Sequence, residues 1–168
     1  MITYRDATPA DAAALASLGA SSFTETFGHL YTPADLALFL DKHSAASWSA
    51  ELADPAFAVR VVEDDGAMIA YAKLGPPQLP FTPPTGATEL RQFYVLAPWH
   101  GAGIAAALME WVIATARANH AGELFLSVFT DNHRARRFYA RYGFEEVGPY
   151  AFMVGTHADE DIVMKLAL

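Results

Sequence analysis

In "PWHGAGIAAALMEW", Pro98 to Trp111, two glycines stand directly before a helix-forming run. The first backbone amides of a helix have no partner within the helix, and with the helix dipole they form a site for anions. Glycine leaves these amides uncovered because it has no Cβ. The segment from His100 to Ala105 therefore predicts a phosphate-binding turn. The competing interpretation is a tight strand-to-helix turn that needs Gly101 and Gly103 for backbone reasons alone.

Two familiar nucleotide motifs fit this stretch poorly. Gly101 to Ala106 matches G-x-G-x-x-A, the dinucleotide fingerprint. However, Ala97 to His100 separates the preceding strand from the first glycine, and the acidic residue expected at the end of the next strand stands at its start, as Glu123. Only 65 residues follow Gly103, too few for the rest of a usual dinucleotide domain. A P-loop is excluded because no Gly-Lys-Ser/Thr follows the glycines.

A second segment, "NHRARRFYARYGFEEVG", runs from Asn132 to Gly148, and its first part predicts a helix that ends before Gly143. Each notable residue has a structural explanation: Asn132 as a helix cap, Tyr139 as a half-buried core aromatic, and Gly143 as a C-cap. The spacing of these residues, about 30 positions after the glycine turn, is harder to explain by structure alone.

Together the two segments resemble the GNAT superfamily of N-acetyltransferases. The family's acyl-CoA motif is (Q/R)-x-x-G-x-(G/A), and here His100 takes the first position, Gly103 the fourth and Ala105 the sixth. His100 departs from the usual Gln or Arg, but the family's phosphate contacts are mainly backbone amides. The family's second signature, N-x-x-A-x-x-x-Y-x-x-x-G-F, is matched at Asn132, Ala135, Tyr139, Gly143 and Phe144.

This resemblance implies an α/β fold with a twisted mixed sheet flanked by helices, forming a single N-acetyltransferase domain over residues 1–168. The sheet is expected to split near the end of the strand at 89–96 to admit the cofactor. It implies acetyl-CoA as cosubstrate, no metal, and direct attack by the primary amine of a small molecule. The residues implied to bind the cofactor are Phe93, Tyr94, Val95, His100, Gly101, Ala102, Gly103, Ile104, Ala105, Asn132, Ala135, Phe138 and Tyr139.

A narrower resemblance concerns the acceptor. "FTETFGHLY", Phe23 to Tyr31, and "FMVGTHADEDIVMKL", Phe152 to Leu166, look like bacterial polyamine (spermidine/spermine) N-acetyltransferases. A protein or peptide N-acetyltransferase, and a module that binds acyl-CoA without turnover, are the alternatives. A polyamine site needs carboxylates, for which the candidates are Glu25, Asp35, Asp41, Glu51, Asp54 and Asp159 to Asp161; an ordinary acidic surface is the competing explanation.

The implied reaction assigns roles to particular groups. A leaving thiolate benefits from a proton, and a tyrosine phenol with a pKa of about 10 is protonated at neutral pH and can act as general acid. Tyr139 suits this role, since the family places this tyrosine near the thioester sulfur. The resemblance also makes the backbone amide of Val95 the oxyanion donor. Phe93 to Val95 would then pair with the pantetheine arm like an added strand.

The general base is the least determined role. An alkylammonium has a pKa of about 10.4 and must lose a proton before it attacks. Glu89 on the central strand, and Glu25 and His29 in the helical region that usually walls the acceptor site, are the candidates, and a water chain is the alternative. A cluster of arginines either faces the nucleotide phosphates or is solvated: Arg134, Arg136, Arg137 and Arg141.

In the rest of the chain, the spacing of hydrophobic residues and the helix-capping residues predict helices and strands in alternation. Asp65-Gly66 predicts a hairpin turn, and the proline-rich stretch 75–87 predicts a loop. Predicted helices begin after Thr8 and Thr32 and cover 44–52, 101–119 and 132–142. Predicted strands cover 2–6, 57–63, 68–74, 89–96, 124–129, 144–147 and 162–166.

Composition excludes several classes of protein. The formal net charge of −8 argues against a nucleic-acid partner, whose phosphates are contacted by Lys and Arg. No cysteine is present and no H-x-x-x-H pair occurs, which argues against disulfides and a helical metal site. No apolar run approaches the roughly 18 residues of a membrane span, and no leader is evident. We expect a cytoplasmic enzyme whose aromatic residues are compatible with a homodimer.

Overall fold

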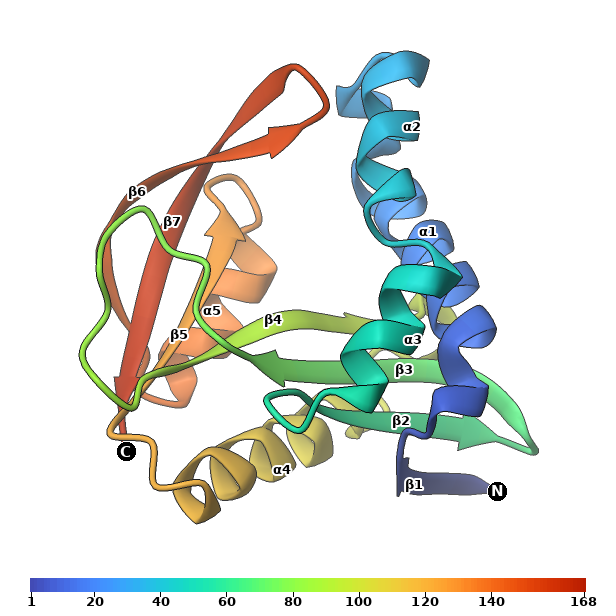
Figure 1. Cartoon of the computed structure of the whole chain (residues 1–168), viewed down its shortest axis with the longest axis horizontal. Helices are drawn as coiled ribbons and strands as arrows, with labels where there is room; N and C mark the ends of the chain where they lie inside the picture. The colour runs from blue at the N-terminus through green and yellow to red at the C-terminus, as the bar shows by residue number, and fades with distance from the viewer.

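The computed structural model describes residues 1–168, which build one seven-stranded sheet in the order β1-β2-β3-β4-β5-β7-β6 (Figure 1). Only β4 and β5 run parallel, and every other neighbouring pair is antiparallel. The predicted mixed sheet is therefore confirmed. The strands are β1 (Ile2–Asp6), β2 (Ala58–Asp64), β3 (Ala67–Gly75), β4 (Thr88–Val95), β5 (Glu123–Phe129), β6 (Glu145–Val154) and β7 (His157–Ala167).

Helices cover both faces of the sheet. Along β2, neighbouring residues point to opposite faces, as the period of a strand requires. Val61 packs with the cluster that contains Leu15 of α1 and Trp48 of α3, whereas Val62 packs with Leu108 of α4. In Figure 1, α1, α2 and α3 accordingly gather on one side of the strands and α4 lies on the other. The helices are α1 (Ala12–Phe27), α2 (Pro33–Asp41), α3 (Ala45–Ala53), α4 (Ile104–Ala118) and α5 (His133–Arg141).

Local capping explains where these helices begin. The Thr32 hydroxyl accepts from the Asp35 amide at 3.2 Å, and the Asn132 side chain accepts from the Ala135 amide at 3.3 Å. Two boundaries differ from the prediction. Thr8 opens a 3₁₀ turn over Pro9–Asp11, so α1 starts only at Ala12. The helix predicted from residue 101 starts at Ile104, because Gly101 and Gly103 have positive φ angles that an α-helix does not allow.

The sheet splits earlier than the sequence suggested. β4 and β5 pair only at Thr88 with Leu124 and at Glu89 with Phe125, so they part at the start of the 89–96 strand rather than near its end. The register between β3 and β4 shifts at the same point, which leaves Arg91 as an extra residue of β4. A bulge bends its strand. The bulge thus turns the rest of β4 away from β5, as Figure 1 shows.

The C-terminal hairpin is longer than predicted. The sequence suggested strands over 144–147 and 162–166, but β6 and β7 extend to a turn at Gly155. Pro149 and the acidic run around Asp159 obscured the alternation. The turn is held by α2, since the Asp35 carboxylate accepts from the Thr156 amide and hydroxyl, both at 2.7 Å. A Cβ at Gly155 would lie 2.6 Å from the Asp35 Cα, so this close approach requires glycine.

Candidate active site

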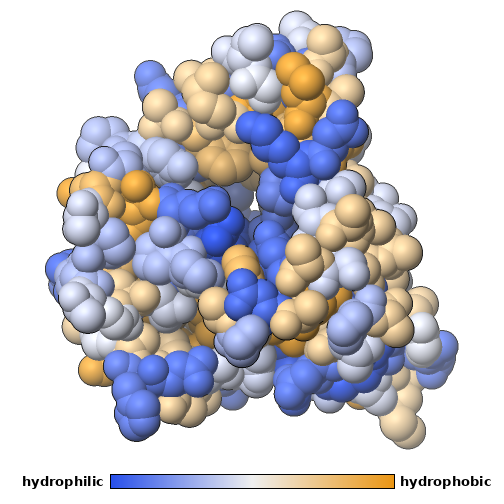
Figure 2. Space-filling model, viewed as in Figure 1, coloured by the Kyte–Doolittle hydropathy of each residue, from blue (hydrophilic) through white to orange (hydrophobic).

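A cavity of about 860 Å³ lies where β4 and β5 diverge. Its wall is built by β4, β5, the glycine turn before α4, the helices α1 and α5, and β7. Figure 2 shows a hollow between the two halves of the molecule, bordered largely by hydrophilic residues. The split in the sheet therefore creates a site reached by side chains from distant parts of the chain.

The glycine turn presents unpaired backbone amides to this cavity. Gly101 and Gly103 have φ angles of +80° and +81°, and a Cβ on either would meet nothing within 4 Å. The Ala107 amide makes the first intrahelical bond, to the Gly103 carbonyl at 3.1 Å, so the amides of residues 103–106 have no acceptor. Ala102 differs, since its amide is bonded to the Trp99 carbonyl at 3.4 Å. Free amides at the start of a helix are suited to an anion.

Cationic side chains line the same cavity as these amides. Arg134, Arg137 and Arg141 line the cavity, whereas Arg136 does not, because it bonds the Thr130 carbonyl at 2.8 Å and Glu146 at 2.5 Å. His100 links this region to β4. We call the free amides of residues 103–106, with these three arginines and His100, the anion wall.

His100 joins the two sides of the cavity mouth through both ring nitrogens. Its Nε2 lies 2.7 Å from the Val95 carbonyl oxygen, and its Nδ1 lies 2.7 Å from Nη1 of Arg134. A carbonyl only accepts and a guanidinium only donates, so the proton of this neutral imidazole belongs on Nε2. The His100 ring thereby fixes Arg134 against the end of β4.

Tyr139 lines the cavity from α5. It is buried, and its ring packs edge-on against Phe93 at 6.4 Å, Phe138 at 5.6 Å and Phe144 at 5.8 Å between centroids. Its hydroxyl has no hydrogen-bond partner in the chain. Burial raises the pKa of the phenol well above its ordinary value, so the hydroxyl stays protonated and available as a donor at neutral pH.

Carboxylates form another part of the cavity wall. Glu25 comes from α1, and Asp159 and Asp161 come from one face of β7, two residues apart. The Tyr31 hydroxyl donates to Asp159, which also lies 3.2 Å from Nε2 of His157. We call Glu25, Asp159 and Asp161 the acidic wall.

Asp161 is the most unusual of these groups. Its side chain is only 7% exposed, and it has no hydrogen-bond or ionic partner. Burial, and then the charge of Asp159, raise the pKa of this carboxyl to about 7. Asp161 therefore gains or loses a proton near neutral pH.

Comparison with known proteins identifies the family. A sequence model of the acetyltransferase (GNAT) family matches residues 20–144. The chain belongs to the GNAT family. The chain is 36% identical to an uncharacterised N-acetyltransferase of Mycobacterium tuberculosis strain H37Rv over 155 residues. This alignment covers 92% of the chain and 96% of the relative. The protein is thus an N-acetyltransferase, as predicted.

Solved structures share the GNAT fold over nearly the whole chain. The PaiA N-acetyltransferase of Thermoplasma acidophilum, solved with coenzyme A, covers 100% of this chain and 99% of its own with a TM-score of 0.79 at 16% identity. The YncA protein of Salmonella typhimurium, solved with its cofactor acetyl-CoA, matches 100% of this chain and 94% of its own with a TM-score of 0.76 at 22% identity. At these identities the likeness supports the fold.

The structure brings most of the predicted GNAT site residues together. Three do not line the cavity: Ala102 is exposed beside it, the Ile104 side chain is buried in the core while its amide is free, and Glu89 lies elsewhere. The predicted residues that do line it are Glu25, Phe93, Tyr94, Val95, His100, Gly101, Gly103, Ala105, Asn132, Ala135, Phe138 and Tyr139.

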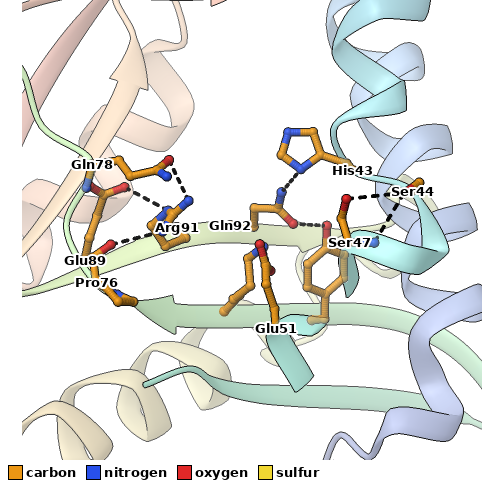
Figure 3. A network of polar contacts seen from close by, with 11 residues as sticks. His43, Ser44, Ser47, Glu51, Pro76, Gln78, Glu89, Arg91 and Gln92 are labelled. Atoms are coloured by element: carbon orange, nitrogen blue, oxygen red, sulfur yellow. Dashed lines mark hydrogen bonds and ion pairs between the residues drawn. The ribbon is translucent and has the colours of Figure 1, made fainter. Parts of the chain in front are cut away.

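Glu89 ties the proline-rich loop to β4 instead. Its carboxylate accepts from the Gln78 amide at 2.9 Å and lies 3.6 Å from Nε of Arg91, which also binds the Pro76 carbonyl (Figure 3). Burial raises the pKa of Glu89 to about 7, so a perturbed carboxyl occurs outside the cavity as well. The sequence placed Glu89 on the correct strand but could not show which way its side chain points.

Several of the predicted acidic residues also lie outside the cavity wall. Asp35 holds the hairpin turn, and Glu51 pairs with the buried Lys73. Asp41 and Asp54 are exposed and do not line the cavity, and neither does His29. The pattern Asp-x-Asp on a strand would have marked Asp159 and Asp161 as residues of one face, had the extent of β7 been known.

We expect Asp161→Asn to stabilise the GNAT fold at alkaline pH. The wild-type carboxyl has a folded pKa of about 7 against an ordinary value of 3.8. Below about pH 4 the carboxyl is protonated in both the folded and the unfolded state, so it does not lower the free energy of unfolding. As the pH rises through the folded-state pKa, the buried carboxyl becomes charged and the folded state loses stability. At about 1.4 kcal/mol per pKa unit, the variant gains on the order of a few kcal/mol at pH 8.

Thermal unfolding at pH 4 and pH 8 measures this effect. The variant should unfold at a higher temperature than wild type at pH 8 and at nearly the same temperature at pH 4. An equal shift at both values would contradict the pKa assigned to Asp161, because a pure packing change does not depend on protonation.

Proposed function

We propose that this GNAT enzyme transfers an acetyl group from acetyl-CoA to the primary amine of a small molecule, with a polyamine as the favoured acceptor. The observation that carries the proposal is one cavity whose lining includes the anion wall, the acidic wall and the protonated phenol of Tyr139. An anionic cosubstrate and a cationic acceptor fit the two walls respectively.

The anion wall suits the diphosphate of coenzyme A. The free amides of residues 103–106 and the glycines that leave them uncovered match a phosphate in charge and shape. Arg134, held by His100, adds a guanidinium that pairs with phosphate oxygens. The solved PaiA and YncA structures hold coenzyme A and acetyl-CoA on the same fold, which supports this role for the wall.

The open edge of β4 suits the amide-containing arm of the cosubstrate. The Leu96 amide bonds to the Ile69 carbonyl of β3, so the peptide groups of Val95 point to the opposite, unpaired edge. There the Val95 carbonyl accepts from His100 and its amide is available as a donor. When bound, acetyl-CoA supplies a thioester carbonyl. The Val95 amide stabilises negative charge on its oxygen, and Tyr139 donates a proton to the sulfur.

The acidic wall suits an alkylammonium acceptor. Aromatic rings stand among its carboxylates, notably those of Phe27, Tyr31 and Tyr94. Carboxylates and aromatic faces both attract ammonium groups. A polyamine presents several such groups along an apolar chain, which matches the mixture of carboxylates and rings. The cavity wall therefore favours a multiply charged alkylamine over an amino acid, whose own carboxylate would be repelled.

A thiol-release assay with acetyl-CoA tests the proposal over a panel of polyamines, aminoglycosides, amino acids and peptides. We expect kcat/KM to be highest for polyamines and to fall as salt is added, because the attraction is electrostatic. Turnover on peptides alone would indicate a peptide N-acetyltransferase. Binding of acetyl-CoA without turnover on any amine would indicate a non-catalytic binding module.

A further inference from the structure

Asp161 is the one buried charged side chain of the chain that lacks a partner. The other buried charged residues are each hydrogen-bonded or ion-paired: Asp11, Asp35, Lys73, Glu89 and Asp159. A buried carboxylate without a partner costs stability. Buried groups with perturbed pKa values cluster at functional sites. Because Asp161 lines the acceptor cavity, its missing partner points to a ligand.

Aromatic residues surround Asp161. It pairs across the sheet with Phe129 of β5 and Tyr150 of β6, so it lies in the middle of the C-terminal strands. Burial first, and then carboxylates that include Asp161, raise the pKa of Tyr31, Tyr94 and Tyr150. The charge of Asp161 thus reaches phenols from three separate segments, of which Tyr31 and Tyr94 line the cavity.

We propose that Asp161 is the catalytic base, which accepts a proton from the acceptor's ammonium group before the nitrogen attacks. This assignment rests on the proposed function. Glu89 does not reach the cavity, Glu25 is exposed on α1, and Asp159 is occupied by Tyr31. A folded pKa of about 7 suits a base that works at neutral pH.

The protons and bonds of the reaction balance with this base. Asp161 takes the first proton of the ammonium and releases it to solvent. The neutral nitrogen forms its bond to the acyl carbon, and the carbon–sulfur bond breaks. Tyr139 gives its proton to the departing sulfur, and the second proton lost by the nitrogen restores the phenol. The products are the amide, the free thiol and one proton in solution.

The test compares Asp161→Asn with Glu160→Gln, an equally conservative change at the next residue, which is exposed and does not line the cavity. The acceptors are the best alkylamine of the panel and its aminooxy analogue; for 1,4-diaminobutane this is 1-aminooxy-3-aminopropane. The aminooxy nitrogen is neutral at assay pH and needs no base. We expect Asp161→Asn to lower kcat about a hundredfold or more for the alkylamine but only a fewfold for N-acetylation of the aminooxy end. Glu160→Gln should match wild type.

The pH profile gives a second measurement on unmodified enzyme. With the alkylamine, kcat should rise through an apparent pKa near 7, and with the aminooxy acceptor this limb should be absent. The titratable groups that interact electrostatically with Asp161 are Asp159 on β7, Tyr150 on β6, Tyr94 on β4 and Tyr31 before α2, and Tyr139 on α5 and Glu25 on α1 line the same cavity. The Asp161→Glu variant keeps a carboxylate at this position. With the alkylamine, its kcat should therefore show part of the rise with pH that the wild type shows.

The outcomes separate this inference from the proposed function. No turnover of any amine by wild type would overturn both. Turnover by wild type with an Asp161→Asn variant that is equally fast, or equally slowed on both acceptors, would overturn the role of Asp161 alone. If Asp161→Asn does not fold, the pH profiles of wild type with the two acceptors decide. A rise of kcat through an apparent pKa near 7 with both acceptors, or with neither, would overturn the assignment.

Discussion

Tyr139→Phe should lower kcat for acetyl transfer about a hundredfold while the Kd for acetyl-CoA stays within a factor of two or three. The substitution removes only the hydroxyl, and general acid catalysis contributes about 10²–10⁴ in rate. The ring remains packed against Phe93, Phe138 and Phe144, so the shape of the cavity is kept. Steady-state thiol release and calorimetry with acetyl-CoA measure the two quantities.

Tyr142→Phe is the matched control for this prediction. Tyr142 follows α5 directly, packs on Phe138 at 5.2 Å between centroids, and does not line the cavity. Its hydroxyl should be dispensable for rate and for binding. A Tyr139→Phe enzyme as fast as Tyr142→Phe would remove the phenol from the mechanism. A large loss of acetyl-CoA affinity would instead assign it to binding.

Short-range signals explain what the sequence could predict. The glycine turn and the α5 segment are each fixed by residues within a few positions of one another, such as Asn132 capping the Ala135 amide. Their spacing therefore predicted the family and the central strand, and it singled out residues that line the cavity. The hairpin turn at Asp65-Gly66 was predicted for the same reason, and β2 and β3 pair across it.

The features that sequence reasoning missed depend on pairing between distant residues. β7 lies between β5 and β6, and only this position buries Asp161 and turns it into the cavity. Glu89 and Asp161 are both acidic residues within strands, yet a bulge at Arg91 and a loop over Glu89 give them different surroundings. Neither the bulge nor the covering loop has a local pattern that would have revealed it.

Gly103→Val should raise the Kd for acetyl-CoA at least tenfold and should also lower the stability of the fold. Gly103 has a φ angle of +81°, where a β-branched residue is strained by roughly 1–2 kcal/mol. Relief of that strain would rotate the peptide groups that present the free amides of residues 104–106. The valine side chain would also take space on the cavity side that an anion needs. Calorimetry and thermal unfolding measure the two effects.

Gly66→Val is the control that separates the effect of backbone strain from the effect on acetyl-CoA binding. Gly66 has a similar φ angle of +86°, also with nothing within 4 Å of an added Cβ, but it lies in the turn between β2 and β3, away from the cavity. The two variants should therefore lose comparable stability, while only Gly103→Val loses affinity. Equal affinity in both would mean that the amides before α4 do not hold the cosubstrate. The anion wall would then have to act through Arg134, Arg137 and Arg141 alone, since these are its remaining charged groups.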